Sequence, residues 1–207
     1  MNKNIIELNN VSKEFNGKKV VDNVNLNIKK GSITGIIGRN GSGKTVLLKM
    51  ICGLYFPSSG EVKLNSVCVS DDFGVLIDSG FLDNETGFDN LLILSKLKNV
   101  INSNDIIDIM KFVKLDPYLK TKYKNYSTGM KQKLRLAQAL MEKPKVLILD
   151  EPFNGMDKES VNYLRGKLLE LKDENITIII TNHYQEDIDK LCDIVYEMDF
   201  GKIELKQ

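Results

Sequence analysis

Cysteine, proline and histidine are scarce in this chain, and so is net charge. Among 207 residues there are three cysteines, four prolines and one histidine, and the formal net charge at pH 7 is +1. The cysteines are scattered and form no CxxC pair: Cys52, Cys68 and Cys192. A disulfide framework or a cysteine-based metal site is therefore a poor interpretation, and we expect small core residues in a reducing compartment. A charge so close to zero gives no electrostatic reason to expect nucleic acid as a partner.

Long apolar runs are missing as well. The most apolar stretches, residues 146–149 and 176–180, have the length of β-strands and fall far short of the ~20 residues that a helix needs to cross a bilayer. Residues 1–7 lack the apolar core of a signal peptide, because Glu7 interrupts them. With 42% hydrophobic and 28% charged residues, the composition is typical of a soluble globular protein. We therefore expect a cytoplasmic protein with one domain, or with one domain and a small subdomain.

Hydrophobic periodicity divides the chain into outer parts that alternate strands and helices and a helical middle. Strands are expected at 5–8, 24–28, 33–37, 61–64, 73–77, 146–149, 176–180 and 194–198. Helices are expected at about 43–53, 159–171 and 186–192, and further helices fill the middle. This alternation favours a mostly parallel sheet buried on both faces. The sequence thus predicts one α/β domain over residues 1–207, with a core at about 1–84 and 143–207 and a helical insert at about 85–142.

A glycine-rich loop follows the third expected strand and precedes a helix. Residues 38–45 read GRNGSGKT and match the phosphate-loop pattern GxxxxGK[ST] completely. Glycines let consecutive backbone N–H groups point at phosphate oxygens, and the helix start adds partial positive charge. Lys44 would reach the β- and γ-phosphates, and the Thr45 hydroxyl would bind Mg²⁺. The expected phosphate-binding residues are Gly38, Arg39, Asn40, Gly41, Ser42, Gly43, Lys44, Thr45 and Val46. An ordinary glycine-rich turn is the weaker interpretation, because strand, motif and helix occur together.

Two acids follow a buried strand. Residues 146–149 are apolar, and Asp150 and Glu151 come directly after them. They emerge at the carboxyl edge of the sheet, where open α/β sheets bind ligands. Asp150 suits a magnesium shell, and Glu151 could polarise an attacking water. Such a pair is often only a solvated turn, but the phosphate loop upstream favours the functional interpretation.

A second helix start has the features of an anion site. Ser127 is a good N-cap, and apolar residues continue a helix behind it through Leu140. Free N–H groups and the small residue Gly129 would accept another phosphate. Nothing within one chain obviously needs two phosphate sites.

Residues 126–140, YSTGMKQKLRLAQAL, resemble the signature segment of the ATP-binding-cassette (ABC) family. The resemblance implies a P-loop NTPase core with a mostly parallel sheet, a small antiparallel β part and a helical signature subdomain. It also implies ATP and Mg²⁺ as cofactors and head-to-tail pairing of two cassettes. In such a pair Ser127 and Gly129 of one chain close on the γ-phosphate held by the phosphate loop of the other, which resolves the second anion site.

Further segments match the family in order. Phe15 corresponds to the aromatic residue that stacks on adenine, although it could be an ordinary core or surface aromatic. Residues 154–157 resemble the loop that contacts the second cassette. His183, the one histidine, corresponds to the switch residue that contacts the γ-phosphate; a lone histidine is more often structural, but its place after an expected central strand favours function. With Lys44 and Glu151 it completes the expected catalytic set.

The chain departs from the family pattern in two places. Thr128 and Met130 replace a glycine and a glutamine of the signature, while Ser127 and Gly129 are kept. Asp78 occupies the position where the family usually carries a glutamine that senses the metal. Asp78 is shorter than glutamine and adds negative charge near the polyphosphate. Either Mg²⁺ offsets that charge, or Asp78 reaches the metal only through water, and we expect it to sense Mg²⁺ in either case.

The resemblance implies an ATP hydrolase that energises transport through a separate transmembrane permease subunit, on the cytoplasmic face of a membrane. A second copy of this chain is the expected partner cassette, and no nucleic acid partner is expected. The short chain and the unusual signature look most like small exporter-type cassettes for peptide or drug efflux. Two alternatives stay open: a soluble ABC-type switch on a non-membrane complex, and a nucleotide-binding protein without turnover. An intact set of phosphate-loop residues and acids argues against the latter.

Overall fold

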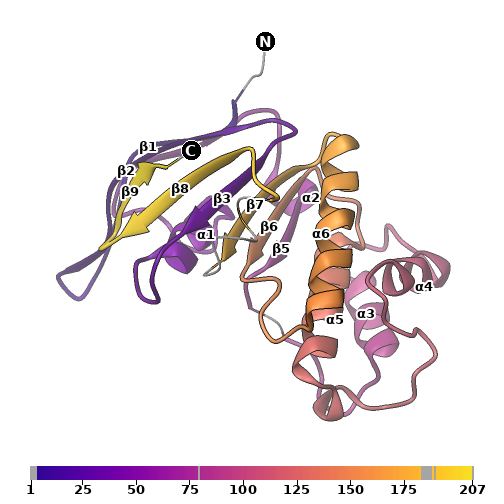
Figure 1. Cartoon of the computed structure of the whole chain (residues 1–207). Helices are drawn as coiled ribbons and strands as arrows, with labels where there is room; N and C mark the ends of the chain where they lie inside the picture. Colours follow the sequence, from indigo (N-terminus) through magenta and orange to yellow (C-terminus); the bar gives the residue numbers. More distant parts are fainter. Residues whose placement is uncertain (1–3, 79, 183–187, 189, 207) are drawn as a thin grey trace.

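Two sheets and a group of helices build the molecule. The structure is a computed structural model that describes residues 4–78, 80–182, 188 and 190–206. The smaller sheet is antiparallel, in the order β2 (Lys18–Lys29), β1 (Asn4–Phe15) and β4 (Ser59–Leu64). The larger sheet has the order β5 (Phe73–Leu76), β6 (Val146–Asp150), β7 (Thr177–Asn182), β3 (Ile33–Ile37), β8 (Ile194–Asp199) and β9 (Lys202–Leu205). All its strands are parallel except β9, which pairs antiparallel with β8 (Figure 1).

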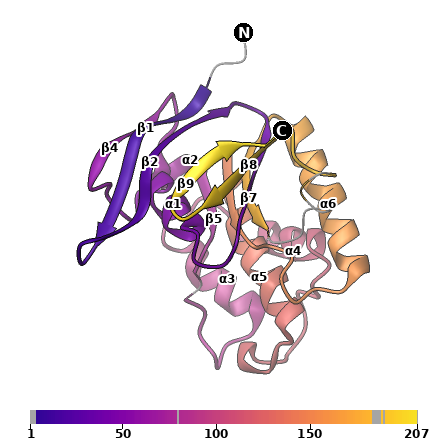
Figure 2. The same cartoon turned by 60° about the vertical axis from the view of Figure 1, so that its left-hand side comes forward.

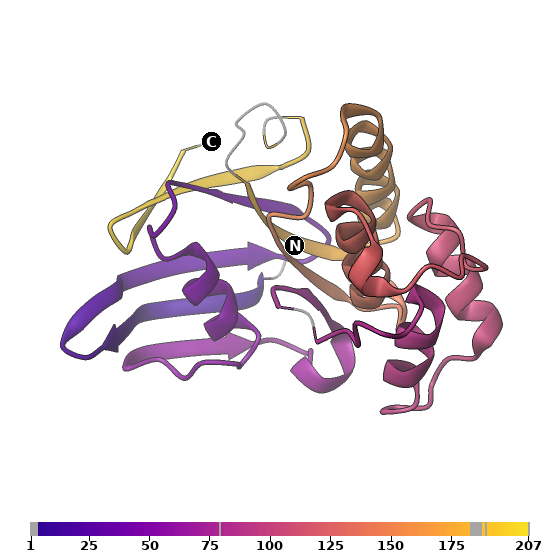
Figure 3. The same ribbon diagram turned by 90° about the horizontal axis from the view of Figure 1, so that it is seen from below.

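The helices separate into two groups. The helix α1 (Lys44–Ile51) follows β3 and lies between the two sheets (Figure 2). The other long helices gather at the end of the larger sheet away from the smaller one (Figure 3): α3 (Gly87–Ser95), α4 (Ser103–Phe112), α5 (Thr128–Leu140) and α6 (Lys158–Asp173). Short helical turns occur at α2 (Val69–Asp72) and at residues Tyr123–Asn125. This arrangement confirms the predicted α/β class, with its mostly parallel sheet, small antiparallel part and helical group.

Both faces of the larger sheet are buried. Along β6, Leu147 and Leu149 belong to the apolar core under the helical group, whereas Val146 and Ile148 belong to the core shared with α1 and the smaller sheet. None of the four is exposed to solvent. Each such side chain contributes about 1.5–3 kcal/mol to folding. The continuous apolar runs in the sequence are therefore the central strands, as predicted from their composition.

The first two strands are longer than predicted. Strands β1 and β2 each span 12 residues, where short strands at 5–8 and 24–28 were expected. The apolar alternation is broken at Asn9-Asn10, and the register of β1 against β2 shifts between Leu8 and Val11. Asn10 has a positive φ of 50°. Backbone pairing continues across this irregularity. The side-chain periodicity could not predict that continuation.

Two short elements were missed by the sequence interpretation. Strand β9 exposes Lys202 and Glu204, and only Ile203 is partly buried, so its apolar signal is weak. A tight turn at Phe200-Gly201, with φ values of 43° and 81°, joins it to β8. The helix α2 has four residues, too few to show a helical period. Of the helix predicted at 186–192, residues 186, 187 and 189 lie outside the described residues, and Lys190 and Leu191 form a turn.

Helix α5 lies directly on strand β5. A Cβ atom added to Gly74 in β5 would stand 1.9 Å from the Ala139 carbonyl oxygen of α5, so the two backbones touch. The Ser127 hydroxyl caps the start of α5 by accepting from the Met130 N–H at 3.2 Å, as predicted. The close contact at Gly74 fixes α5 against the sheet, and the cap fixes where α5 begins.

Candidate functional site

The predicted phosphate loop connects β3 to α1. Positive φ values occur at Gly38 (150°), Gly41 (79°) and Gly43 (111°), a backbone path that side chains resist. A Cβ at Gly38 would lie 2.1 Å from the Met198 carbonyl oxygen, and a Cβ at Gly43 would lie 2.6 Å from the Val20 carbonyl oxygen. Neighbouring strands therefore enclose the loop on two sides. Arg39, Asn40 and Gly41 are exposed at its outer edge, and Val46 is partly buried in α1.

Lys44 is folded into this loop. Its ammonium group donates to the carbonyl oxygens of Gly38 at 2.7 Å and Arg39 at 2.9 Å, and the residue is 4% exposed. Burial lowers the pKa of Lys44, and the carboxylates of Glu151 and Asp150 partly oppose that shift. A buried ammonium in a glycine-rich loop is a charge that a polyphosphate would neutralise.

Ser42 leaves an unused polar atom in the same loop. Its hydroxyl is buried and has no hydrogen-bond partner among the described residues. Such a group is costly unless a ligand or water completes it. The loop thus fits an oxygen-rich anion by its backbone path, its buried cation and its unpaired hydroxyl.

The Asp150 carboxylate joins the ends of three elements. It accepts from the Thr45 hydroxyl at 2.6 Å and from the Thr181 hydroxyl at 2.5 Å. Thr45 opens α1, Asp150 ends β6, and Thr181 lies near the end of β7. The two oxygens predicted to bind the metal, on Thr45 and Asp150, are therefore brought together.

Glu151 follows in an unusual backbone conformation. Its φ is 49°, in the left-handed region that a residue with a side chain rarely occupies. Hydrogen bonds hold it on both sides: its N–H donates to the Thr181 carbonyl oxygen at 3.2 Å and to the Thr181 hydroxyl at 3.0 Å, and its carbonyl oxygen accepts from the Gln132 side chain at 2.9 Å. This conformation ends β6 and turns the chain at Glu151 toward the site.

Two side chains of α5, which the sequence interpretation missed, reach the site. Gln132 is 5% exposed, and Arg135 donates to its side-chain oxygen at 3.1 Å and to the Ile77 carbonyl oxygen at 2.6 Å. A cavity of about 350 Å³ joins the phosphate loop, the acids and α5, lined by Thr45, Ile77, Thr128, Gln132, Arg135, Asp150, Glu151 and Asn154. Helix α5 also carries Lys131, Lys133 and Gln138, so the sequence offered no signal that marks Gln132 and Arg135 among its polar residues.

Asp78, the third predicted metal ligand, does not lie with Thr45 and Asp150. It does not line the cavity that Thr45 and Asp150 share. Its carboxylate is exposed and pairs with the Lys49 ammonium of α1 at 2.7 Å, a contact that raises the pKa of Lys49. The structure therefore places Asp78 beside the phosphate-loop helix but not with the other two predicted metal ligands, and its metal role stays a prediction.

The signature tip, residues 127–129, is accessible. Ser127 is exposed and Gly129 is partly buried. Beside it, the Thr128 methyl group packs on the loop after Glu151: a Cβ added to Gly155 would lie 2.5 Å from the Thr128 Cγ2 atom. Thr128, which departs from the family pattern, thus meets a glycine that leaves room for it.

Phe15 and His183 are the remaining predicted site residues. Phe15 ends β1 and is 39% exposed, with its ring edge-to-face with Tyr55 at 5.6 Å. The Lys13 ammonium stands 5.1 Å from the Phe15 ring centre. His183 lies outside the described residues.

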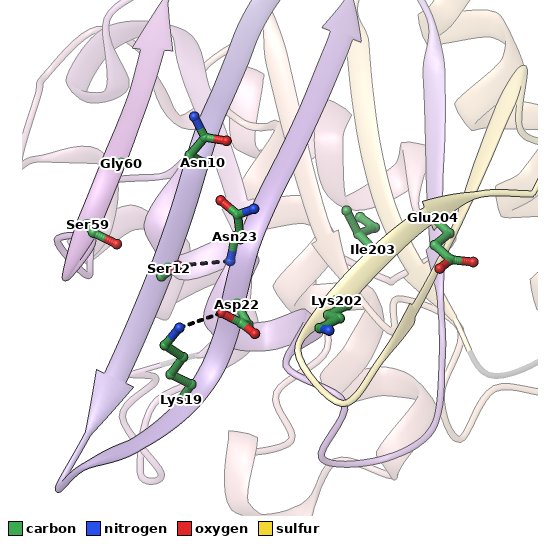
Figure 4. Close-up of a pocket in the computed structure, with 10 residues that line it drawn as sticks. All are labelled: Asn10, Ser12, Lys19, Asp22, Asn23, Ser59, Gly60, Lys202, Ile203 and Glu204. Carbon is green, nitrogen blue, oxygen red and sulfur yellow. Dashed lines mark hydrogen bonds and ion pairs between the residues drawn. The ribbon is translucent and has the colours of Figure 1, made fainter.

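A second hollow lies between the smaller sheet and strand β9. It has a volume of about 720 Å³ and is lined by Asn10, Ser12, Lys19, Asp22, Asn23, Ser59, Gly60, Lys202, Ile203 and Glu204 (Figure 4). Lys19 pairs with Asp22 at 2.8 Å, and the Ser12 hydroxyl accepts from the Asn23 N–H at 2.9 Å. The phosphate loop is nearby, because the Gly201 N–H donates to the Ser42 carbonyl oxygen, but none of the residues 38–46 lines the hollow.

A strand, a glycine loop closed around a buried lysine, and an acid at the end of a parallel strand that lies one strand beyond its neighbour β7 define a P-loop nucleotide-binding protein. The family model described as ABC transporter matches residues 21–154. The chain is 40% identical to the uncharacterized ABC transporter ATP-binding protein YybJ of Bacillus subtilis, over 98% of this chain and 96% of that protein. It is 36% identical to the bacitracin transport ATP-binding protein BcrA of Enterococcus faecalis, over 96% of this chain and 68% of that protein.

Solved structures agree. A nucleotide-free ATP-binding cassette from an ABC transporter superposes with a TM-score of 0.83 at 26% identity, covering 97% of this chain and 90% of the other. A dimeric bacterial ABC transporter cassette has the same fold, with a TM-score of 0.87 at 23% identity and 96% of each chain covered. The chain therefore belongs to the ABC transporter family, as its ATP-binding and ATP-hydrolysing subunit.

The Asp150 hydrogen bonds predict that Thr181→Val impairs turnover. The change removes the hydroxyl that donates to Asp150 and accepts from Glu151, at nearly constant volume. We expect kcat to fall about tenfold, the effect of ~1.4 kcal/mol on the barrier, with little change in ATP affinity. Steady-state phosphate release measures this.

Thr34→Val is the matched control on the adjacent strand β3. The Thr34 hydroxyl is buried without a hydrogen-bond partner among the described residues, so its loss should leave kcat unchanged and stability equal or higher. Equal kcat values for the two variants would show that the Thr181 hydroxyl does not organise the site.

Proposed function

We propose that two copies of this chain bind two ATP molecules between them, head to tail, and that hydrolysis opens the pair to drive a membrane subunit. The observation that carries this proposal is that one chain holds both a glycine loop closed around Lys44 and a separate, accessible helix start at residues 127–129. Each half would be completed by the other chain. Membership of the ABC transporter family supports this pairing, because two paired chains would use the phosphate loop of one and the signature tip of the other.

The residue roles follow from placement and chemistry. Residues 38–46 would cradle the phosphates, Phe15 would stack on adenine, and Ser127 with Gly129 of the second chain would contact the γ-phosphate. Glu151 would orient the attacking water, while Lys44 and His183 would stabilise the charge that develops on the phosphate oxygens. The division into a core at about 1–84 and 143–207 and a helical insert at about 85–142 is part of the same proposal.

The oxygen donors at the phosphate loop fit a magnesium ion that the nucleotide brings with it. Thr45 and Asp150 offer one hydroxyl and one carboxylate, and the described residues hold no cluster of three or more His, Cys, Asp or Glu side chains that could bind a metal unaided. Mg²⁺ commonly takes one or two protein oxygens and completes its shell with phosphates and water. When bound, it would neutralise charge on the β- and γ-phosphates. We propose that Asp78 contributes through water after leaving Lys49.

Asp78→Ala tests that contribution. Because the variant lacks a carboxylate that we place in the outer shell of the metal, we expect the Mg²⁺ concentration for half-maximal hydrolysis to rise about three- to tenfold, a loss of ~0.7–1.4 kcal/mol. ATP binding without Mg²⁺ should stay the same. Asp83→Ala, an exposed acid five residues on, is the control. If both variants keep the wild-type Mg²⁺ dependence, Asp78 is only the partner of Lys49.

Glu151→Gln tests the shared-site dimer. The amide keeps the size of the side chain but removes the base, so we expect ATP binding to persist while kcat falls at least about 100-fold. ATP would then stay between the chains, and the variant should run as a dimer in size-exclusion chromatography with ATP and Mg²⁺ and as a monomer without them.

Glu159→Gln is its control. That carboxylate is exposed at the start of α6 and pairs loosely with Lys114 at 3.6 Å, so hydrolysis and monomer–dimer behaviour should match the wild type. A Glu151→Gln protein that stays monomeric at saturating ATP and Mg²⁺ refutes the proposed pairing.

We propose a separate permease subunit as the partner in the membrane and the cytoplasmic membrane surface as the location. None of the helices in the described part of the chain combines the length and the apolar character that a membrane span needs. Relatives at 36% and 32% identity are named bacitracin transport and lantibiotic transport ATP-binding proteins. These names support export of antimicrobial peptides as the direction and cargo. Cells that carry the Glu151→Gln form should then retain more labelled peptide antibiotic than cells with the wild type, and equal retention would exclude this cargo.

A further inference from the structure

Two hydrogen bonds link helix α5 to two segments of the ATP site, and a third joins the two α5 side chains that make them. Arg135 donates one guanidinium N–H to the Ile77 carbonyl oxygen at 2.6 Å and another to the Gln132 side-chain oxygen at 3.1 Å. Gln132 in turn donates its side-chain N–H to the Glu151 carbonyl oxygen at 2.9 Å. One cation on α5 thereby holds the chain just before Asp78 and, through an amide, the backbone of Glu151.

The arginine fixes which way the glutamine points. A guanidinium group only donates, so the amide must turn its oxygen toward Arg135 and its NH₂ group toward the Glu151 carbonyl. Gln132 is 5% exposed, and the two side chains lie three residues apart on one helix face. Within the described residues no carboxylate pairs with Arg135, and its Nε is buried without a hydrogen-bond partner. The guanidinium therefore makes its hydrogen bonds to one backbone oxygen, of Ile77, and one side-chain oxygen, of Gln132.

Glu151 is the residue that needs such support. Its φ of 49° is costly for a residue that carries a side chain, and it persists only when neighbouring groups hold it. Thr181 holds its N–H side, and Gln132 holds its carbonyl side. Loosening the Gln132 contact would let the Glu151 backbone relax toward more common conformations and carry its carboxylate with it.

The same helix begins at the signature tip. Ser127 and Gly129 lie within about two turns of Gln132 and Arg135 on α5, which has 13 residues. A displacement of the tip would move the whole rigid helix, and with it both donors. Thr128 adds a second contact, because its methyl group packs on Gly155 in the loop after Glu151.

We propose that Arg135 and Gln132 are positioning residues that transmit the occupancy of one ATP site to the other. When the signature tip closes on the nucleotide of the second chain, α5 sets the Glu151 backbone and the Ile77 segment of its own chain. Each chain becomes competent for hydrolysis only when its tip is engaged. This inference rests on the proposed dimer, and it predicts that hydrolysis depends sigmoidally on ATP concentration.

The two contacts of Gln132, with Arg135 and with the Glu151 carbonyl oxygen, form what we call the relay. Gln132→Glu is the sharpest test, because it keeps the first contact and removes the second. The carboxylate can still accept from Arg135, but it cannot donate to the Glu151 carbonyl oxygen. We expect kcat to fall about tenfold or more, the Hill coefficient for ATP to fall below the wild-type value, and the affinity for ATP without Mg²⁺ to stay within about twofold. Thermal unfolding should change little, since the charge pair with Arg135 replaces a neutral contact.

Arg135→Ala should reproduce the loss of cooperativity, and Arg135→Lys should not restore it, because a lysine cannot hold both acceptors in a fixed fork. Arg165→Ala, on α6, is the matched control and should keep wild-type values; the Arg165 guanidinium contacts Asn162 of its own helix. Wild-type protein with a Hill coefficient of 1, or relay variants with an unchanged coefficient, would overturn the proposal.

The dimer assay keeps the two proposals apart. The double variants Glu151→Gln/Gln132→Glu and Glu151→Gln/Arg135→Ala should still form the ATP-dependent dimer, because the relay acts after closure. If Glu151→Gln alone stays monomeric, the proposed function fails. If all three dimerise while cooperativity survives in Gln132→Glu and Arg135→Ala, only the relay fails.

Discussion

The Asp150 carboxylate is the interaction on which the site depends. It accepts one hydroxyl hydrogen bond from Thr45 and another from Thr181, and so ties the start of α1 to the ends of β6 and β7. The parallel register places Asp150 opposite Thr181, while β3, which leads into the phosphate loop, pairs with the other side of β7. Because these strands run in the same direction, their carboxyl ends converge, and the hydroxyls of two threonines can share one carboxylate. That junction sets the positions of the phosphate loop and of Glu151.

The phosphate loop and the central strands were predictable because local chemistry dictates both. Glycines at Gly38, Gly41 and Gly43 permit one backbone path, and Val146–Asp150 is an apolar run that ends in an acid. Strand β9 could not be found in the same way, since its side chains mostly face solvent. Its strand conformation comes from backbone pairing with β8. The full length of β1 was missed because asparagines interrupt its alternation, although the backbone continues to pair with β2 and β4.

The contacts around Asp78, Gln132 and Arg135 depend on tertiary structure alone. Lys49 meets Asp78 only because α1 and the end of β5 lie side by side, and nothing in either local sequence marks the pair. Arg135 finds the Ile77 carbonyl oxygen because α5 rests on β5 at Gly74, where no side chain intervenes. The resemblance to the ABC family located the signature segment and its outward-facing tip, but it could not indicate that the same helix also holds this chain's own Glu151.

The division of each ATP site between two chains is tested most directly by mixing two inactive variants. Lys44→Ala removes the cradle cation, and Ser127→Arg blocks the signature tip; each homodimer then has two defective sites. In a mixed dimer both defects fall on one site, and the other combines an intact Lys44 with an intact Ser127. The account predicts that ATP-dependent pairing in size-exclusion chromatography, absent for each variant alone, returns when the two are mixed. A mixture that stays as monomeric as its separate components would contradict it.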